Sequence, residues 1–171
     1  MAQPKLVPQK PTGAYIGASW VALLIGVSLY FIGLWNADME LNEKGYYFSI
    51  LFFGLFAVIS IQKTIRDRAE DIPVTNIYYG VAWAAVLVDL LLLAVGLWNA
   101  DMLLSEKGFY GVTMVLSLFA VISVQKNVRD MAVFAEIEKA EEPKRKPVIP
   151  GQEAPKAAPV NPPAARPYRP E

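Results

Sequence analysis

The stretch GLWNADM at Gly33–Met39 decides the fold, because it occurs a second time, unchanged, at Gly96–Met102. Laid over each other at a shift of 63 residues without a gap, Gly33–Asp67 and Gly96–Asp130 agree at 22 of 35 positions. The agreement forms two blocks, GLWNADM with its exit EKG, and LFAVIS-x-QK-x-x-RD. Between the blocks the copies share only hydrophobicity. The chain is therefore an internal duplication.

Four long runs with almost no charge flank these motifs. The first, Ala14–Leu34, holds about 21 apolar residues, roughly 31 Å of helix, which matches the ~30 Å hydrocarbon core of a bilayer. A soluble bundle would show polar residues every three or four positions, whereas stretches such as Leu51–Ile59 are apolar all round. We therefore predict an all-α membrane protein with four transmembrane helices, at about residues 14–35, 45–62, 77–98 and 108–125.

The duplication sets the predicted organisation. Each repeat, 13–70 and 76–133, contains two spans, so the repeats form two parallel helical hairpins related by a pseudo-two-fold axis along the membrane normal. We expect a short disordered lead at 1–12 and a disordered, proline-rich tail at 134–171. The fourth helix can continue into the start of this tail, as far as Lys139. Residues 142–171 hold nine prolines.

The distribution of basic residues predicts the orientation. The loops that join the two spans of each repeat contain the sequence WNAD, and we call them the WNAD loops. Each WNAD loop carries one lysine. The lead, the connection at residues 62–76 and the start of the tail carry seven lysines and arginines together. By the positive-inside rule, both termini are expected in the cytoplasm and both WNAD loops on the other side. The seven are Lys5, Lys10, Lys63, Arg66, Arg68, Lys126 and Arg129.

Composition excludes several classes of function. Sixteen basic residues balance sixteen acidic ones, which argues against nucleic-acid binding. The sequence has no cysteine and no histidine, so it offers no thiolate or imidazole metal site and no cysteine–histidine or serine–histidine nucleophile pair. We therefore predict no catalytic, cofactor-binding or metal-binding residues and no enzymatic activity.

The WNAD loops supply most of the candidate functional or interface residues. The tryptophans are expected at the membrane interface, and the asparagines in the left-handed conformation that ends a helix. Asn42 and Ser105 are expected to cap the following helices. The repeated aspartate and lysine either form an ion pair that braces each hairpin or make a paired acidic–polar surface site. The candidates are Trp35, Asn36, Asp38, Lys44, Trp98, Asn99, Asp101 and Lys107.

The QK-x-x-RD motif lies at the other end of the second and fourth spans. Its lysine and aspartate, four residues apart, are expected to pair on one helix face. Its lysines and arginines anchor the topology, or form a rim that binds lipid headgroups or a partner. These anchors are Lys63, Arg66, Lys126 and Arg129.

Asp89 is the one ionisable residue inside a predicted span, and its repeat counterpart is Gly26. A lipid-exposed carboxylate at that depth costs on the order of 2.5–3.5 kcal/mol, so Asp89 should face the bundle interior. It should also be protonated or paired there. The available partners are hydroxyls and amides such as those of Ser28, Tyr30, Ser60, Ser117 and Ser123. Structural hydrogen bonding and a proton or ion pathway both remain open.

The two repeated blocks, GLWNADM followed by EKG[YF]Y and LFAVIS-x-QK-x-x-RD, resemble the YiaA/YiaB family of small bacterial inner-membrane proteins. That family is defined by the YiaAB two-helix domain, and the resemblance covers residues 13–131. It implies a multi-pass protein of the bacterial inner membrane with two such domains. It implies no catalytic residue and no cofactor.

Three functional hypotheses follow. The first is a non-enzymatic scaffold or stress-related accessory protein that packs with itself or with other membrane proteins in the lipid bilayer. The alternative is a small oligomeric permease or ion pathway that uses Asp89. A membrane enzyme, with a hard cation held by Asp38, Asp101, Glu43 and Glu106, comes a distant third.

Overall fold

The computed structural model describes residues 10–141 as four helices: α1 (Gly13–Asn36), α2 (Leu41–Ala69), α3 (Asn76–Asn99) and α4 (Leu104–Glu141). Each is long and apolar enough to cross a membrane. The predicted four-span, all-α fold is therefore confirmed, and the described region contains no strand. Most of the expected lead and tail, residues 1–9 and 142–171, lies outside the described residues. The part of the tail that is described belongs to α4, which continues to Glu141.

Repeated threonines begin the first helix of each repeat. The Thr12 hydroxyl accepts a hydrogen bond from the Tyr15 amide at 3.3 Å, and the Thr75 hydroxyl accepts one from the Tyr78 amide at 3.2 Å. These bonds satisfy amides that have no partner within the helix. Between the repeats, the turn after α2 contains Asp71, which has φ 58° and is the one non-glycine residue with positive φ in the described chain.

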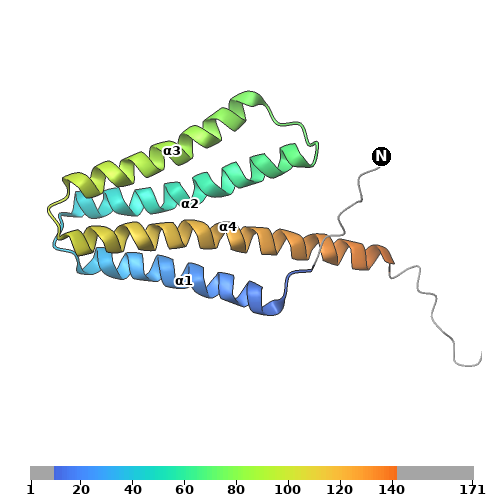
Figure 1. Ribbon diagram of the computed structural model, residues 1–171, viewed down its shortest axis with the longest axis horizontal. Helices are drawn as coiled ribbons and strands as arrows, with labels where there is room; N and C mark the ends of the chain where they lie inside the picture. The colour runs from blue at the N-terminus through green and yellow to red at the C-terminus, as the bar shows by residue number, and fades with distance from the viewer. Residues whose placement is uncertain (1–9, 142–171) are drawn as a thin grey trace, which may run out of the picture.

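Helix packing crosses between the repeats. The main contacts join α1 to α4 and α2 to α3, while α2 and α4 meet at the centre. Across the bundle the helices therefore follow the order α1, α4, α2, α3 (Figure 1). Since the pseudo-two-fold axis exchanges α1 with α3 and α2 with α4, the two outer contacts are equivalent. The repeats are interlaced, because the first helix of each packs mainly on the second helix of the other.

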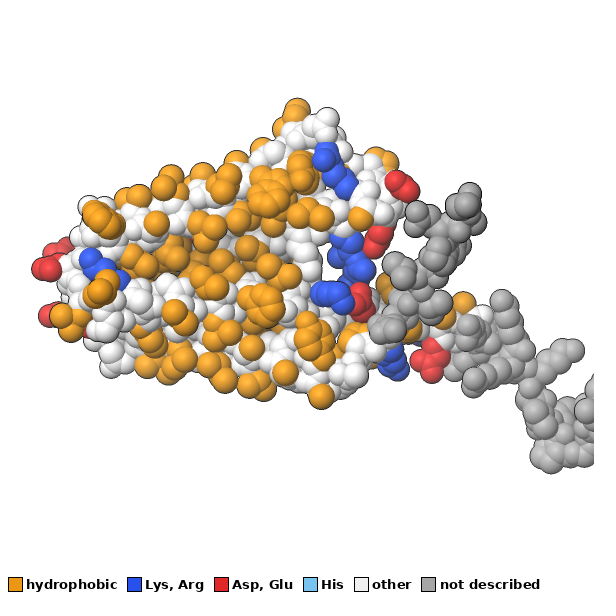
Figure 2. All heavy atoms as spheres, viewed as in Figure 1, with side chains coloured by type: hydrophobic (Ala, Val, Ile, Leu, Met, Phe, Trp, Pro, Cys, Tyr) orange, Lys and Arg blue, Asp and Glu red, His pale blue; other side chains and the backbone are white. Residues whose placement is uncertain are grey.

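The core lies along the two central helices. Tyr30, Leu51 and Met114 are fully buried, and they pack with other residues of α1, α2 and α4. The outer helices expose apolar faces instead, as Leu24 on α1 and its counterpart Leu87 on α3 are each 62% exposed. Figure 2 shows apolar side chains spread over the length of the bundle, with charged groups gathered at its two ends. This distribution suits helices surrounded by lipid.

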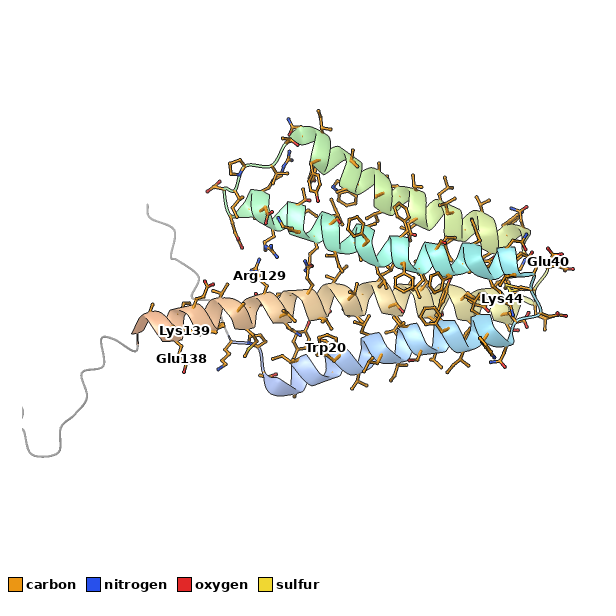
Figure 3. The ribbon with its side chains drawn as sticks, turned by 180° about the vertical axis from the view of Figure 1, so that it is seen from behind. Trp20, Glu40, Lys44, Arg129, Glu138 and Lys139 are labelled. Atoms are coloured by element: carbon orange, nitrogen blue, oxygen red, sulfur yellow. The ribbon has the colours of Figure 1, made fainter. Side chains whose placement is uncertain are left out.

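The repeats bring like motifs to the same end of the bundle. We call the end that carries residues 35–39 and 98–102 the WNAD end, and the end that carries residues 63–67 and 126–130 the basic end. Glu40 and Lys44 lie at the first and Arg129 toward the second (Figure 3). The parallel duplication thus gives each surface two copies of one motif.

Candidate functional site

The repeated lysine of each WNAD loop binds a backbone carbonyl at the end of the preceding helix, and not the aspartate of the loop. Lys44 Nζ donates to the Trp35 carbonyl at 3.2 Å, and Lys107 Nζ donates to the Trp98 carbonyl at 3.3 Å. Within the described residues neither Asp38 nor Asp101 forms an ion pair. The expected lysine–aspartate brace is therefore wrong. A cation at a helix C-terminus is favourable because the last carbonyls are unpaired and partly negative.

The asparagines also end their helices differently from the prediction. Asn36 Nδ2 donates to the Ile32 carbonyl at 2.7 Å, and Asn99 Nδ2 donates to the Val95 carbonyl at 2.8 Å. Neither residue has a positive φ, so the expected left-handed conformation is wrong. Each asparagine side chain binds the carbonyl four residues earlier in its own helix. The residue that follows, Ala37 or Ala100, is extended and leads the chain toward α2 or α4.

The following helices begin two residues earlier than the predicted caps imply. Glu40 precedes α2, and its amide donates to Glu43 Oε2 at 2.9 Å. In the second repeat the Leu103 amide donates to Glu106 Oε2 at 2.8 Å. Asn42 and Ser105 therefore lie inside the first turn and do not cap it. Each repeated glutamate is used as a backward-reaching cap, which fits its negative charge at a helix N-terminus.

Two pockets open between the repeats at the WNAD end, with volumes of about 290 and 360 Å³. Every residue that lines one pocket has its repeat counterpart in the other. The first is lined by Asn42, Glu43, Tyr46 and Tyr47 with Gly96, Asn99 and Ala100; the second by Ser105, Glu106, Phe109 and Tyr110 with Gly33, Asn36 and Ala37. Asp38, Met39, Asp101 and Met102 line both. Each pocket therefore joins the WNAD loop of one repeat to the EKG[YF]Y segment of the other.

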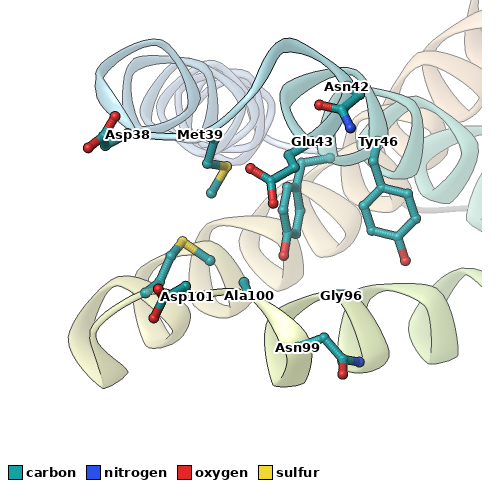
Figure 4. Close-up of a pocket in the computed structure, with 11 residues that line it drawn as sticks. Asp38, Met39, Asn42, Glu43, Tyr46, Gly96, Asn99, Ala100 and Asp101 are labelled. Atoms are coloured by element: carbon teal, nitrogen blue, oxygen red, sulfur yellow. The ribbon is translucent and has the colours of Figure 1, made fainter.

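Figure 4 shows the first pocket in close-up. Glu43 and Tyr46 extend from α2 toward the end of α3, and Met39 points from its loop toward the loop of Asp101. The Tyr46 hydroxyl donates to the Leu92 carbonyl at 2.7 Å, which ties α2 to α3 beside the pocket. The ring of Tyr46 lies against Gly96, where a Cβ would be 2.6 Å from Tyr46 Cε1. The repeated glycine therefore makes room for the aromatic residue of the other repeat.

The two pockets contain similar chemical groups. Each combines carboxylates with amide, thioether and aromatic groups. In the described chain no group of three or more carboxylates is arranged to hold a metal ion. Trp35 and Trp98 line neither of these two pockets, and each is 85% exposed. The tyrosines that line the pockets were not among the predicted candidate residues, although the repeated EKG[YF]Y segment contains them.

Asp89 faces the bundle interior, as predicted, and is 1% exposed. From α3 its carboxylate lies against Gly54 of α2, and Met114 Cε lies beside the same glycine. Its Oδ1 has no hydrogen-bond partner in the described chain. The expected hydroxyl partners are engaged elsewhere: Tyr30 donates to the Tyr47 carbonyl, and Ser117 to the Thr113 carbonyl. The structure separates Asp89 from the pockets, whose linings do not include it.

The predicted pairs at the basic end are present. Lys63 donates to Asp67, and Lys126 Nζ lies 2.9 Å from Asp130 Oδ2. The two arginines of the motif contact the same aspartates, since Arg66 Nη2 is 3.3 Å from Asp67 Oδ1 and the equivalent Arg129 contact is 3.4 Å. The four anchor residues are thus held in two equivalent clusters on α2 and α4.

Comparison with known proteins matches this chain to the family profile described as yiaA/B two helix domain, over residues 15–67 and 78–130. The chain belongs to the YiaA/YiaB two-helix domain family. The two matched segments coincide with the repeats, so each YiaAB domain contributes one half of each pocket. The resemblance stated from the motifs is confirmed.

Two curated relatives are similar to this YiaAB protein. It is 54% identical over 120 residues to "Inner membrane protein YiaA" of Escherichia coli (strain K12), covering 70% of this chain and 83% of the relative. It is 42% identical over 64 residues to "Uncharacterized membrane protein YubF" of Bacillus subtilis (strain 168), covering 37% of this chain and 74% of the relative. No solved structure matches. The membership and the four spans support an integral, multi-pass protein of the inner membrane.

Proposed function

We propose that this YiaAB protein is a non-enzymatic membrane scaffold or stress-related accessory protein, which packs with itself or with other membrane proteins. The observation that carries the proposal is the pair of matched pockets, built from the repeated motifs of opposite repeats. A symmetric pair of surface pockets suits two equivalent contacts with a partner. The pockets contain carboxylates and aromatic rings but no histidine or cysteine, which favours recognition over chemistry.

The outer helices supply the lateral surface for such packing. α1 and α3 present apolar side chains outward, and the duplication gives both faces the same position relative to the pockets. Orientation belongs to the proposal as well: the WNAD end faces away from the cytoplasm, and both termini lie inside. A topology reporter fused after Asn99 should therefore show an external location, and a cytosolic signal would refute the orientation.

Cross-linking in native membranes tests the scaffold role. The chain has no cysteine, so Leu24→Cys and Leu87→Cys introduce single thiols on equivalent lipid-facing positions. We expect a membrane-permeable bifunctional maleimide to link at least one of these variants to a second copy or to another membrane protein. Met114→Cys, at a fully buried position, is the control and should remain unlinked. Monomer alone in both surface variants at native expression levels would count against the proposal.

Asp89 carries a second candidate function, a small oligomeric permease or ion pathway. Its buried carboxylate with an unpartnered oxygen is the observation in favour, since ionisable groups inside membranes commonly serve transport. If this function holds, reconstituted vesicles should show a proton- or cation-coupled flux that Asp89→Asn abolishes. A flux that survives the substitution would exclude this candidate, and so would the absence of any flux with the unmodified protein.

A further inference from the structure

The two arginines of the QK-x-x-RD motifs converge on a single carboxylate at the basic end. Arg129 Nη1 on α4 lies 3.0 Å from Glu70 Oε1, and Arg66 Nε on α2 lies 4.0 Å from the same oxygen. The two nitrogens are therefore at most about 7 Å apart, the sum of the two distances. Two guanidinium groups from equivalent positions thus meet beside the contact between α2 and α4.

The carboxylate between them does not belong to the duplication. Arg66 and Arg129 are repeat counterparts, but the counterpart of Glu70 is Val133. The symmetric part of the arrangement is therefore the pair of cations, and one acidic side chain from the first repeat occupies the space between them. Figure 2 shows basic side chains gathered between the two halves of the bundle at this end.

The arginines are held in position and still have donors to offer. Each contacts the aspartate that follows it through its Nη2 atom, at 3.3 Å for Arg66 and 3.4 Å for Arg129, which leaves the other nitrogens of the guanidinium for other acceptors. The Nε atom of each arginine is buried and has no acceptor in the described chain. Burying such a donor without an acceptor is unfavourable, so an acceptor that displaces the Glu70 carboxylate and reaches these donors would be stabilised.

The depth of the pair corresponds to lipid headgroups. Arg66 follows the apolar run that ends at Ile61 by five residues, about 7.5 Å along a helix. The side chains of Arg66, Arg129 and Glu70 are 25%, 35% and 48% exposed, so a ligand reaches them from the membrane surface. A phosphate group has oxygens on several sides and accepts hydrogen bonds from two guanidinium groups at once.

We propose that Arg66 and Arg129 form a binding site for a phosphate group, and that the Glu70 carboxylate occupies this site as an internal competitor. The ligand chemistry is a phosphate anion, carried either by the headgroup of an anionic phospholipid or by free inorganic phosphate. The site lies at the opposite end of the molecule from the pockets and does not depend on their function. It assigns the repeated arginines a ligand beyond their general role as topology anchors.

The test compares four variants of the full-length protein, purified in detergent. Native mass spectrometry measures the binding of phosphatidylglycerol in one arm and of inorganic phosphate in the other. Arg66→Gln and Arg129→Gln should each lower affinity at least about tenfold, because each removes charge-assisted hydrogen bonds. Arg68→Gln is the matched control: it removes the same charge at the same end, but Arg68 contacts Asn76 and the Tyr79 ring. At roughly 0.5 M salt, which screens diffuse attraction, its effect should stay within about twofold.

Glu70→Gln keeps the test decisive even if an arginine variant folds poorly. Removing the competing charge should raise affinity several-fold, a gain that misfolding cannot produce. Binding of either probe in this order of variants supports the site, and the probe that binds identifies the source of the phosphate. Equal losses in all three arginine variants, no gain in Glu70→Gln, or no binding of either probe would overturn the proposal.

Discussion

Asp89 on α3 packs against Gly54 on α2, and the duplication places the reverse arrangement at the equivalent crossing, where Gly26 on α1 packs against Ser117 on α4. A Cβ at Gly54 would contact the Asp89 carboxylate and lie 2.6 Å from Met114 Cε. A Cβ at Gly26 would lie 2.6 Å from Ser117 Oγ and 3.1 Å from its backbone nitrogen. Each crossing therefore pairs one glycine with one polar residue. The glycine lies on the second helix of its repeat at one crossing (α2) and on the first helix of its repeat at the other (α1).

This relationship predicts coupling between Gly54 and Asp89. Gly54→Ser should destabilise the protein by about 1–3 kcal/mol, because the new side chain overfills the crossing. Adding Asp89→Gly should recover part of that loss, since the double variant recreates the Gly26–Ser117 arrangement. Unfolding in mixed micelles measures the four free energies of the cycle. A coupling below about 0.5 kcal/mol, the range for independent sites, would contradict direct packing of the two residues.

The repeated glycines should divide into two classes on substitution by alanine. Gly45 and Gly108 lie within helices, and a Cβ added at either would meet nothing within 4 Å, so alanine should stabilise by about 0.5–1 kcal/mol. A Cβ at Gly33 or Gly96 would lie 2.6 Å from the ring of Phe109 or Tyr46, and alanine there should destabilise by about 1–3 kcal/mol. Thermal unfolding in detergent distinguishes the classes. Destabilisation at Gly45 would show that its open side is in contact in the native assembly.

The lysine caps predict independence from the neighbouring aspartates. Lys44→Met should cost roughly 1 kcal/mol or less, because it removes an exposed hydrogen bond to the Trp35 carbonyl. Combining it with Asp38→Asn should give additive effects within about 0.5 kcal/mol. Chemical unfolding of the two single variants and the double variant measures this. A larger coupling would restore the lysine–aspartate brace that the structure rejects.

The interlaced packing predicts that the two repeats hold together without a covalent link. Co-expressed fragments 1–73 and 74–171 should co-purify through an affinity tag on one fragment, since each outer helix packs on a helix of the other fragment. The chain break falls in the connection between α2 and α3 and removes no helix. Fragments that separate in mild detergent, although each inserts in the membrane, would argue for self-contained hairpins.

The fold could be predicted from the sequence further than the packing. Charge-free runs such as Ala14–Leu34 predicted the four helices, because in lipid the backbone must satisfy its own hydrogen bonds. The repeat predicted that like motifs share an end. It did not predict which helices pack, because Gly26 and Gly54 reveal their partners only when the crossings are seen.

The candidate site was predicted only in part. Asp89 and the Lys63–Asp67 pair lie where the sequence indicated. The loop chemistry differed because the helix-end carbonyls compete with aspartate for the lysines, and glutamate competes with asparagine and serine for the caps. A pocket shared between repeats has no signature within one repeat. Its lining by equivalent positions of both repeats becomes visible only when the repeats are placed together.

Disulfide formation between α1 and α4 tests the interlaced arrangement most directly. Asn127 Nδ2 lies 3.1 Å from Ser19 Oγ, whereas Thr64, the repeat counterpart of Asn127, belongs to the same repeat as Ser19. In this cysteine-free chain, Ser19→Cys with Asn127→Cys should oxidise in native membranes and leave no thiol for a polymer-tagged maleimide after denaturation. Ser19→Cys with Thr64→Cys should retain two. The opposite result, with the disulfide formed only within the repeat, would contradict the interlaced bundle and the pockets built on it.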